Sequence, residues 1–283
     1  MLELINRQVD RLAHASFKAG GRSVSPFHIW SAAGLVLAIA IALSFTVHAG
    51  LSSALVLLLV AINLVAAFVL GLTVKVVTGI ERHTHYHYEI AIAVVTIATL
   101  KSLGQPIVPY LDAMAAGKGL LLASGRLGCF MVGCCHGRPF PFGVCYGPAQ
   151  TRRYAGVRLF PVQLVESLLG VVLTTLCAYL LLRGARPGTA LATYVIGYGT
   201  ARFLIELLRG DPQRPYFRSY SEAQWIALLL MSFVVVLEYI SVLPLHMSHV
   251  MLVTGVVAAM LTIAITRRVR QTPPELFTRI INP

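Results

Sequence analysis

The chain has 283 residues, of which 57% are hydrophobic and only 12% are charged, and its formal net charge is +12. This composition is far more apolar than that of a soluble domain and predicts an all-α polytopic membrane protein. The basic residues are dispersed between apolar stretches, which favours attraction to anionic lipid headgroups and argues against nucleic-acid binding. Five cysteines in a chain of this length do not indicate a disulfide-stapled fold.

Residues 1–25 form a basic segment in which arginine and lysine alternate with apolar residues. Two interpretations stay open for it: a short amphipathic helix on the membrane surface, or a solvated basic tail. It lacks the apolar core of a cleavable signal peptide. We therefore expect an N-terminal segment over 1–25, a transmembrane domain over 26–267 and a C-terminal tail over 268–283.

Apolar runs of about 20 residues, long enough to cross a bilayer, recur along the rest of the chain. We expect seven to eight transmembrane helices around a polar central cavity that is open to the bilayer. The expected spans are residues 26–47, 51–77, 88–103, 108 into the glycine-rich motif described below, 161–182, 189–208, 222–242 and 249–266.

A histidine-rich segment, ERHTHYHYE at 81–89, interrupts this pattern before the third expected span. Its three histidines alternate, so all three share one face only in an extended segment, whereas His83 and His87 share a face in a helix. A metal site, an interfacial belt of polar aromatic residues and a histidine that handles substrate or acts as acid or base are all open. We favour the last, with His85 and His87 as candidates.

The most unusual stretch is residues 125–147, GRLGCFMVGCCHGRPFPFGVCYG. Glycine lets backbones approach closely, and a polar, glycine-rich run at membrane depth must be covered by protein. Arginine is expensive there and usually faces an interior or a watery cavity. The stretch therefore predicts the working site of a membrane enzyme, with Arg126, His136, Gly137 and Arg138 as candidate residues.

Four cysteines also lie in this stretch, and with His136 they raise the alternative of a metal or redox site: Cys129, Cys134, Cys135 and Cys145. Two adjacent cysteines suit one tetrahedral ion poorly, and no Cys-x-x-Cys pair is present. Small residues that pack in a glycine-rich turn are the simpler interpretation. We expect no metal and no cofactor.

Two later segments place further polar side chains within apolar runs. In FPVQLVES, Gln163 and Glu166 stand three residues apart on one helix face, although an acidic residue also suits a helix N-terminus. In YGTARFLIELLRGD the polar residues recur at spacings of four, four and three, and so form one stripe that must face protein or water. That stripe consists of Tyr198, Arg202, Glu206 and Arg209.

Three segments, GRLGCFMVGCCHGRP, FPVQLVES and YGTARFLIELLRGD, together resemble the signatures of the prolipoprotein diacylglyceryl transferase family of bacterial membrane enzymes, over roughly residues 110–240. The resemblance implies transfer of the diacylglyceryl group of phosphatidylglycerol to a lipobox cysteine thiol, with glycerol phosphate leaving and no cofactor. The implied partners are phosphatidylglycerol, a lipoprotein precursor peptide and membrane lipids. Nucleic acid is not among them.

By the same resemblance, Arg126 and Arg202 bind the phosphate headgroup, supported by Tyr198 and Glu206. The sequence departs from the family pattern at Cys129 and Cys134, where members carry Asn and Glu, and it lacks the Gly-Gly-x-x-x-His-Gly-Gly segment. The predicted catalytic residues are His87, His85, Arg126, Arg202, Tyr198 and Glu206. The predicted substrate-binding residues are Arg138, Gly137, His136, Gln163, Glu166 and Arg209.

Two alternatives remain: a paralogue that acts on another acceptor, and a non-enzymatic lipid transporter or binding protein, for which no internal repeat is visible. We expect a multi-pass protein of the bacterial cytoplasmic (inner) membrane. Basic residues at both ends of an eight-span chain favour cytoplasmic termini and a cytoplasmic motif. The resemblance instead places the active site on the outer side, and we follow it.

Overall fold

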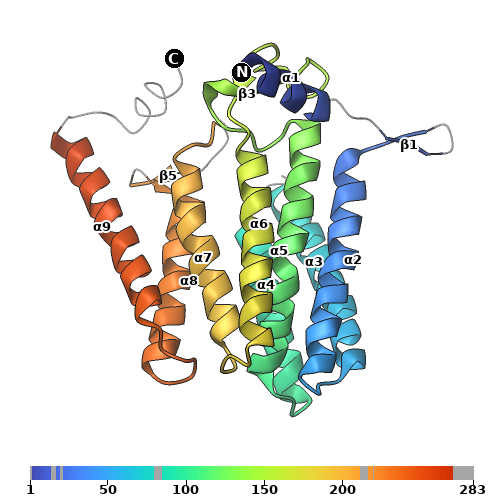
Figure 1. Cartoon of the computed structure of the whole chain (residues 1–283), viewed down its shortest axis with the longest axis vertical. Helices are drawn as coiled ribbons and strands as arrows, with labels where there is room; N and C mark the ends of the chain where they lie inside the picture. The colour runs from blue at the N-terminus through green and yellow to red at the C-terminus, as the bar shows by residue number, and fades with distance from the viewer. Residues whose placement is uncertain are drawn as a thin grey trace.

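The computed structural model of this chain describes residues 2–13, 17–19, 22–79, 85–210, 216–218 and 220–269. Within these residues the protein is a bundle of long helices, with one short helix lying across one end (Figure 1). The helices are α1 (Leu2–Ala13), α2 (Pro26–His48), α3 (Ser53–Thr78), α4 (His85–Ser102), α5 (Ile107–Val132), α6 (Val162–Leu182), α7 (Thr189–Glu206), α8 (Glu222–Tyr239) and α9 (Met247–Val269).

Helices α2, α3, α6, α8 and α9 are each long and apolar enough to cross a membrane, judged on length and composition among the described residues. The expected all-α membrane class agrees with this. The remaining long helices, α4, α5 and α7, carry more polar residues, and α5 and α7 bury much of their surface against their neighbours. We call the end at which α5 ends and α6 begins the motif end, and the other the opposite end (Figure 1).

Short antiparallel strand pairs complete the described structure. They are β1 (Phe17–Ala19) with β2 (Arg22–Val24), β3 (Pro139–Cys145) with β4 (Arg158–Leu159), and β5 (Tyr216–Phe217) with β6 (Tyr220–Ser221). Strand β3 carries the second half of the glycine-rich stretch out of the bundle, and β4 returns the chain to α6. The motif therefore joins the end of α5 to the beginning of α6.

Glycines let α5 lie directly against α2 and α6. A Cβ atom at Gly117 would stand 2.3 Å from the carbonyl oxygen of Ala38 on α2, and one at Gly119 would stand 2.2 Å from that of Gly170 on α6. Small residues at such contacts are the usual way in which membrane helices approach closely. This packing sets the spacing between the functional side chains of α5 and α6.

A buried carboxylate fixes the beginning of α7 against α5. The side chain of Asp112, on α5, accepts hydrogen bonds from the backbone N–H groups of Gly188 and Leu191. The first N–H groups of a helix have no partner within the helix, so this carboxylate acts as their cap from another element. The glycine contacts and this cap together hold α5, α6 and α7 in one group, independently of the functional side chains.

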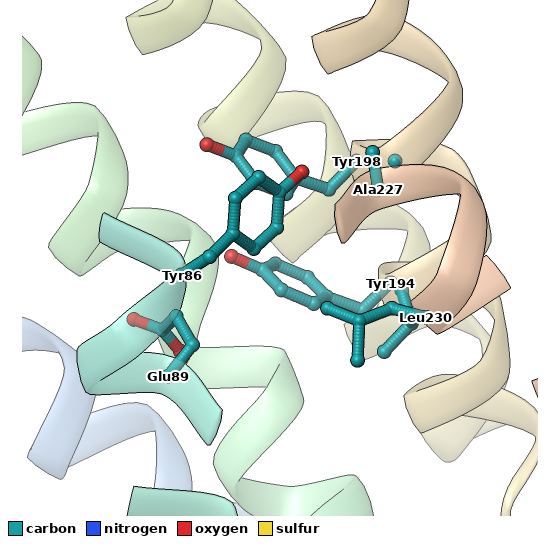
Figure 2. A pocket seen from close by; sticks show the side chains of 8 residues that line it. Tyr86, Glu89, Tyr194, Tyr198, Ala227 and Leu230 are labelled. Atoms are coloured by element: carbon teal, nitrogen blue, oxygen red, sulfur yellow. The ribbon is translucent and has the colours of Figure 1, made fainter. Parts of the chain in front are cut away.

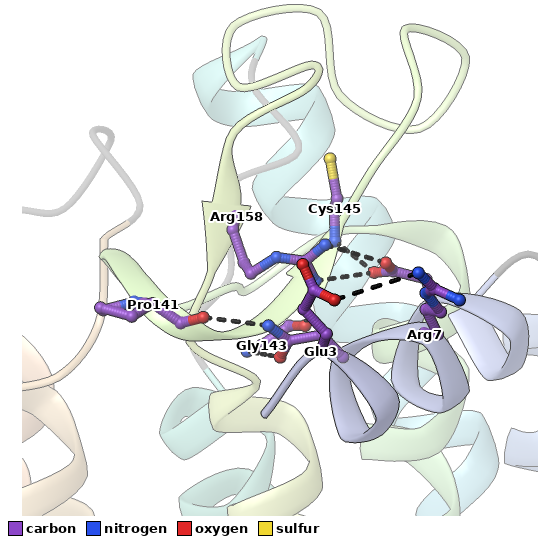
Figure 3. Close-up of polar contacts among 8 residues, drawn as sticks. Glu3, Arg7, Pro141, Gly143, Cys145 and Arg158 are labelled. Carbon is purple, nitrogen blue, oxygen red and sulfur yellow. Dashed lines mark hydrogen bonds and ion pairs between the residues drawn. The ribbon is translucent and has the colours of Figure 1, made fainter. Parts of the chain in front are cut away.

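Helix α1 packs its polar side against the β3–β4 arm (Figure 3). Asn6 accepts a hydrogen bond from Gly143 N and donates one to Pro141 O, each at 3.0 Å. Asp10 accepts from Cys145 N at 2.7 Å and forms an ion pair with Arg158 at 3.0 Å. The apolar residues Leu2, Leu4, Ile5 and Leu12 are exposed instead. Of the two open interpretations, residues 2–13 form the helix, which buries Val9 and Ala13 against the protein and leaves its leucines exposed.

Candidate functional site

One buried carboxylate gathers three arginines at the motif end. Glu166, on the first turns of α6, has a side chain with no exposed surface. Its Oε2 lies 2.7 Å from Nε of Arg126, on α5, and 3.8 Å from Nη1 of Arg209. Its Oε1 binds Nη1 of Arg202, on α7. Residues from three separate segments of the sequence therefore meet at one point, which we call the arginine cluster.

A second carboxylate takes part in the arginine cluster. Glu206 lies one helical turn after Arg202 and binds its Nη2 at 2.5 Å. Three guanidinium groups from separate segments therefore contact two carboxylates. Guanidinium stays charged in proteins and binds oxyanions through pairs of hydrogen bonds. The meeting of several guanidinium groups at one point therefore suits an anionic ligand.

A side-chain amide holds the loop that follows α5. Gln163 donates through Nε2 to the carbonyl of Cys134 at 2.7 Å and to the hydroxyl of Tyr146 at 3.4 Å. That hydroxyl donates in turn to the carbonyl of Phe130 at 2.7 Å. Gln163 was predicted to bind substrate, and the structure places it as a support for the turn beside Arg126.

The next residues of the motif join the end of α7 to the beginning of α6 through the backbone. Gly137 donates to Phe160 O at 3.0 Å and forms a β-bridge with Arg209. A Cβ atom at Gly137 would stand 2.5 Å from that same carbonyl, so no other residue fits without a shift. Arg138 N donates to Leu208 O at 3.1 Å. These backbone hydrogen bonds bring Arg209, which lies beyond the end of α7, into the arginine cluster.

His136 is buried in this loop, and its side chain contacts other residues of the loop. Its Nδ1 lies 2.8 Å from the carbonyl oxygen of Gly137, and its ring packs edge-on against Tyr154 with the centroids 4.9 Å apart. These contacts hold the loop. The side chain of Arg138 is half-buried in the same region.

A small pocket lies next to the arginine cluster along α7 (Figure 2). Three tyrosine rings meet in it, with Tyr86 and Tyr194 each 6.1 Å from Tyr198 between centroids. The pocket has a volume of about 80 Å³. Its lining is Tyr86, Glu89, Tyr194, Val195, Tyr198, Gly199, Ala227 and Leu230. Tyr198 is one turn before Arg202, so the tyrosine pocket continues the predicted polar stripe of α7.

The structure describes the side chain of one of the two candidate histidines of the 81–89 segment. Residues 80–84, with His83, lie outside the described residues, and so does the side chain of His85. Tyr86 is buried against Tyr198, whereas the side chain of His87 is half-exposed and its Nε2 lies 2.9 Å from Oε1 of Glu222, at the start of α8. Glu89, on the same helix, pairs with Lys118 at 2.5 Å.

The family model described as Prolipoprotein diacylglyceryl transferase matches residues 15–264. The chain belongs to this family. Among curated relatives, a phosphatidylglycerol--prolipoprotein diacylglyceryl transferase of Clostridium tetani is 32% identical over 124 residues, which is 43% of this chain and 49% of the relative. One from Clostridium perfringens, numbered 2, is 29% identical over 127 residues, 44% of this chain and 49% of the relative.

A third relative with the same printed name, from Cereibacter sphaeroides, is 34% identical over 113 residues, 36% of this chain and 39% of the relative. The chain spans about half the length, or less, of the curated relatives it matches. Family membership therefore rests on the family model, which covers most of the chain.

In this member of the transferase family, three cysteines gather beside the arginines. The sulfur atoms of Cys129, Cys134 and Cys135 all lie within 4.8 Å of one another, while Cys145 is not part of the group. The thiols of Cys129 and Cys134 donate hydrogen bonds to the sulfur of Cys135, and Arg209 and Arg126 add a positive field. Together they hold the pKa of Cys135 well below its usual range despite burial.

The structure brings together five of the predicted site residues of this transferase-family chain: Arg126, Glu166, Arg202, Glu206 and Arg209. Sequence reasoning missed Tyr86, Tyr194 and Glu222. Tyr194 could have been found, because it stands four residues before Tyr198 on the same stripe. Nothing local marks Glu222 as the partner of a histidine on a distant helix.

Proposed function

We propose that this chain transfers the diacylglyceryl group of phosphatidylglycerol to the thiol of a lipobox cysteine in a lipoprotein precursor. The observation that carries the proposal is the meeting of Arg126 and Arg202, from two different helices, on the buried carboxylate of Glu166. Arginine binds phosphate oxygens through its planar fork, in pairs of hydrogen bonds. The three curated relatives are named phosphatidylglycerol--prolipoprotein diacylglyceryl transferases, which agrees with this donor and this class of acceptor.

In the proposed step a carbon–sulfur bond forms at the glyceryl carbon while its bond to the phosphate oxygen breaks. The electron pair leaves with glycerol phosphate, and the thiol proton goes to a base. The phosphate group gains negative charge as it becomes a monoester, so it binds the arginine cluster more strongly in the transition state than in the ground state. Glu166 and Glu206 hold Arg202 in position before the lipid arrives.

His87 with Glu222 is the proposed base for the thiol. The carboxylate of Glu222 lies 2.9 Å from Nε2, an arrangement that fixes the orientation of the ring. Both side chains are partly exposed, at 46% and 32%, so an incoming peptide has access to them. His85 remains the second candidate from the sequence.

We further propose that α4, α5 and α7 cross the membrane with the five apolar helices, which gives eight spans around the arginine cluster and the tyrosine pocket. The described pocket of about 80 Å³ is small beside ligand pockets on the order of 300–1,000 Å³. A phospholipid must therefore part the helices to enter. The exposed leucines of α1 suit insertion among lipid headgroups at the motif end.

For the orientation, we propose that the motif end faces the outer side of the bacterial inner membrane, as the family resemblance implies. Helix α9 returns the chain to the motif end at Val269, whereas Arg183 follows α6 at the opposite end (Figure 1). A phosphatase that is active only outside the cytoplasm is expected to work when fused after Val269 and to fail when fused after Arg183. The reverse pattern would place the active site in the cytoplasm.

The function is tested by incubating the purified chain in detergent with phosphatidylglycerol and a lipobox peptide and measuring the peptide mass. We expect a diacylglyceryl adduct from the native chain and a loss of at least about 100-fold in rate for Arg126→Ala and Arg202→Ala, since each removes a phosphate ligand. The control is Arg183→Ala, an exposed arginine at the opposite end. An adduct formed equally fast by Arg202→Ala would overturn the proposal.

A further inference from the structure

The three-cysteine group at the end of α5 has no part in the proposed transfer reaction. We propose that Cys129, Cys134 and Cys135 form a binding site for a single thiophilic metal ion with a filled d shell, of the class of Zn²⁺ and Cu⁺. No other group of histidine, cysteine and acidic side chains in the described part of the chain brings ligand atoms this close together.

The spacing of the sulfur atoms suits one ion. A metal–sulfur bond is about 2.3 Å long, so three sulfurs around one ion stand about 4 Å apart in a trigonal or tetrahedral arrangement. In the structure all three sulfurs already lie within 4.8 Å of one another. Sulfur ligands without carboxylates select soft ions and disfavour Mg²⁺ and Ca²⁺.

The backbone is shaped to bring adjacent cysteines to the same place. Gly133, which caps the end of α5, adopts the left-handed conformation, and Cys135 is also left-handed, with φ of 58°. A non-glycine residue seldom adopts this conformation, so the turn must be held by its surroundings. Cys134 N donates to Cys129 O at 3.2 Å, and Gln163 binds Cys134 O at 2.7 Å. Adjacent cysteines usually suit one tetrahedral ion poorly, but this turn brings the sulfur atoms of Cys134 and Cys135 to the same place.

Access also fits a metal site. Cys129 is buried, Cys135 is half-buried and Cys134 is exposed, so the group is anchored inside and open on one side. All five cysteines of the chain are free thiols, and none of these three is held in a disulfide.

The site can be tested without lipid or peptide, so its outcome is independent of the proposed transfer activity. The full chain is purified in detergent under reducing, oxygen-free conditions and titrated with Co²⁺ as an optical probe. We expect a sulfur-to-cobalt charge-transfer band that saturates at one equivalent and disappears when Zn²⁺ is added. A parallel titration with Cu⁺ against a competing chelator tells which of the two ions binds more tightly.

Three single variants, Cys129→Ser, Cys134→Ser and Cys135→Ser, are each expected to weaken Co²⁺ affinity by at least about tenfold, as loss of one ligand does. The matched controls are Cys145→Ser and Cys177→Ser, which remove thiols outside the group and should leave the titration unchanged. Gel filtration and helical circular dichroism establish that each variant is folded. Binding of neither Co²⁺ nor Cu⁺ by the native chain, or equal loss in Cys145→Ser, would overturn the proposal.

Discussion

Two buried clusters of acidic and basic side chains lie at opposite ends of this bundle, and they differ in composition. At the motif end, three guanidinium groups contact two carboxylates. At the opposite end Glu238, on α8, meets His249, on α9, with Nδ1 2.6 Å from Oε1 and both side chains buried. A single hydrogen-bonded pair of this kind is enough to join two helices. Three arginines from separate segments that meet on one carboxylate are more than joining requires, and guanidinium groups so gathered suit a phosphate.

The largest effect is expected from the carboxylate that all three arginines share. Glu166→Gln keeps the shape of the side chain and removes the negative charge that Arg126, Arg202 and Arg209 share. Breaking a buried pair from one side costs about 3–5 kcal/mol, and we expect a fall of roughly 1,000-fold in transfer rate together with lowered thermal stability.

Transfer rate per folded molecule and melting temperature in detergent measure the two effects of Glu166→Gln separately. A variant that melts early but turns over normally would show that the arginine cluster is a structural device like the Glu238–His249 pair. The two ends of the bundle would then not differ in role.

A smaller effect is expected when the positive charge of Arg202 is kept but its planar, two-pronged guanidinium group is removed. In Arg202→Lys a compact ammonium replaces the guanidinium that binds Glu166 and Glu206 at once. We expect about a 100-fold loss of rate, with weaker phosphatidylglycerol binding, since a bidentate phosphate contact is lost. The measurement is rate against lipid concentration in mixed micelles. Arg183→Lys serves as control, and equal behaviour of the two variants would count against a phosphate site.

Glycine substitutions on α5 test whether the packing positions the arginine cluster. Gly119→Ala forces a methyl group towards the carbonyl of Gly170 at 2.2 Å, whereas Gly125→Ala, on the same helix, meets nothing within 4 Å. Overpacking of this kind costs about 1–3 kcal/mol, so we expect Gly119→Ala to lower the melting temperature and the transfer rate. Gly125→Ala should change neither. Similar melting temperatures for both would show that α5 and α6 adjust freely.

The opposite end should affect stability alone. Glu238→Gln weakens the contact with His249 and is expected to lower stability by about 1–3 kcal/mol, because a charged hydrogen bond becomes a neutral one in a buried place. The transfer rate of the folded fraction should stay within twofold of the native rate. A large fall in that rate, at full helical content, would mean that the two ends are coupled.

The smallest effect is expected in the tyrosine pocket. The hydroxyl of Tyr194 is buried without a hydrogen-bond partner among the described residues. Tyr194→Phe removes that cost and should be neutral or slightly stabilising, with little change in rate. A strong loss of activity would indicate that this hydroxyl contacts the substrate, and would extend the functional region from the arginine cluster along α7.

Periodicity and residue type were enough to predict the long apolar helices and several of the residues that meet in the arginine cluster. The apolar run expected over 26–47 is α2, Pro26–His48, because composition and length decide such a helix almost alone. The stripe of Tyr198, Arg202 and Glu206 was also readable, since four-residue spacing places side chains on one helix face. Arg126 could be singled out because arginine is costly within the bilayer.

Other features depend on contacts that no local pattern announces. Whether Tyr86 or His87 faces the bundle depends on where α4 begins and how it turns against α7. Arg209 lies beyond its helix and reaches Glu166 through a backbone bridge at Gly137. The gathering of the cysteines depends on the left-handed conformation of Cys135, which residue type alone would have argued against.

The partners of α1 lie far along the chain: Asn6 and Asp10 bind residues at a separation of 135 or more. During synthesis this helix leaves the ribosome long before Pro141 and Cys145 exist, and closing so long a loop is slow. Helix α1 can form these contacts only after the β3–β4 arm has been synthesised, and until then its exposed leucines can lie among lipid headgroups. A bulky tag placed before Leu2 should therefore delay maturation of the β3–β4 arm more than it disturbs the finished protein.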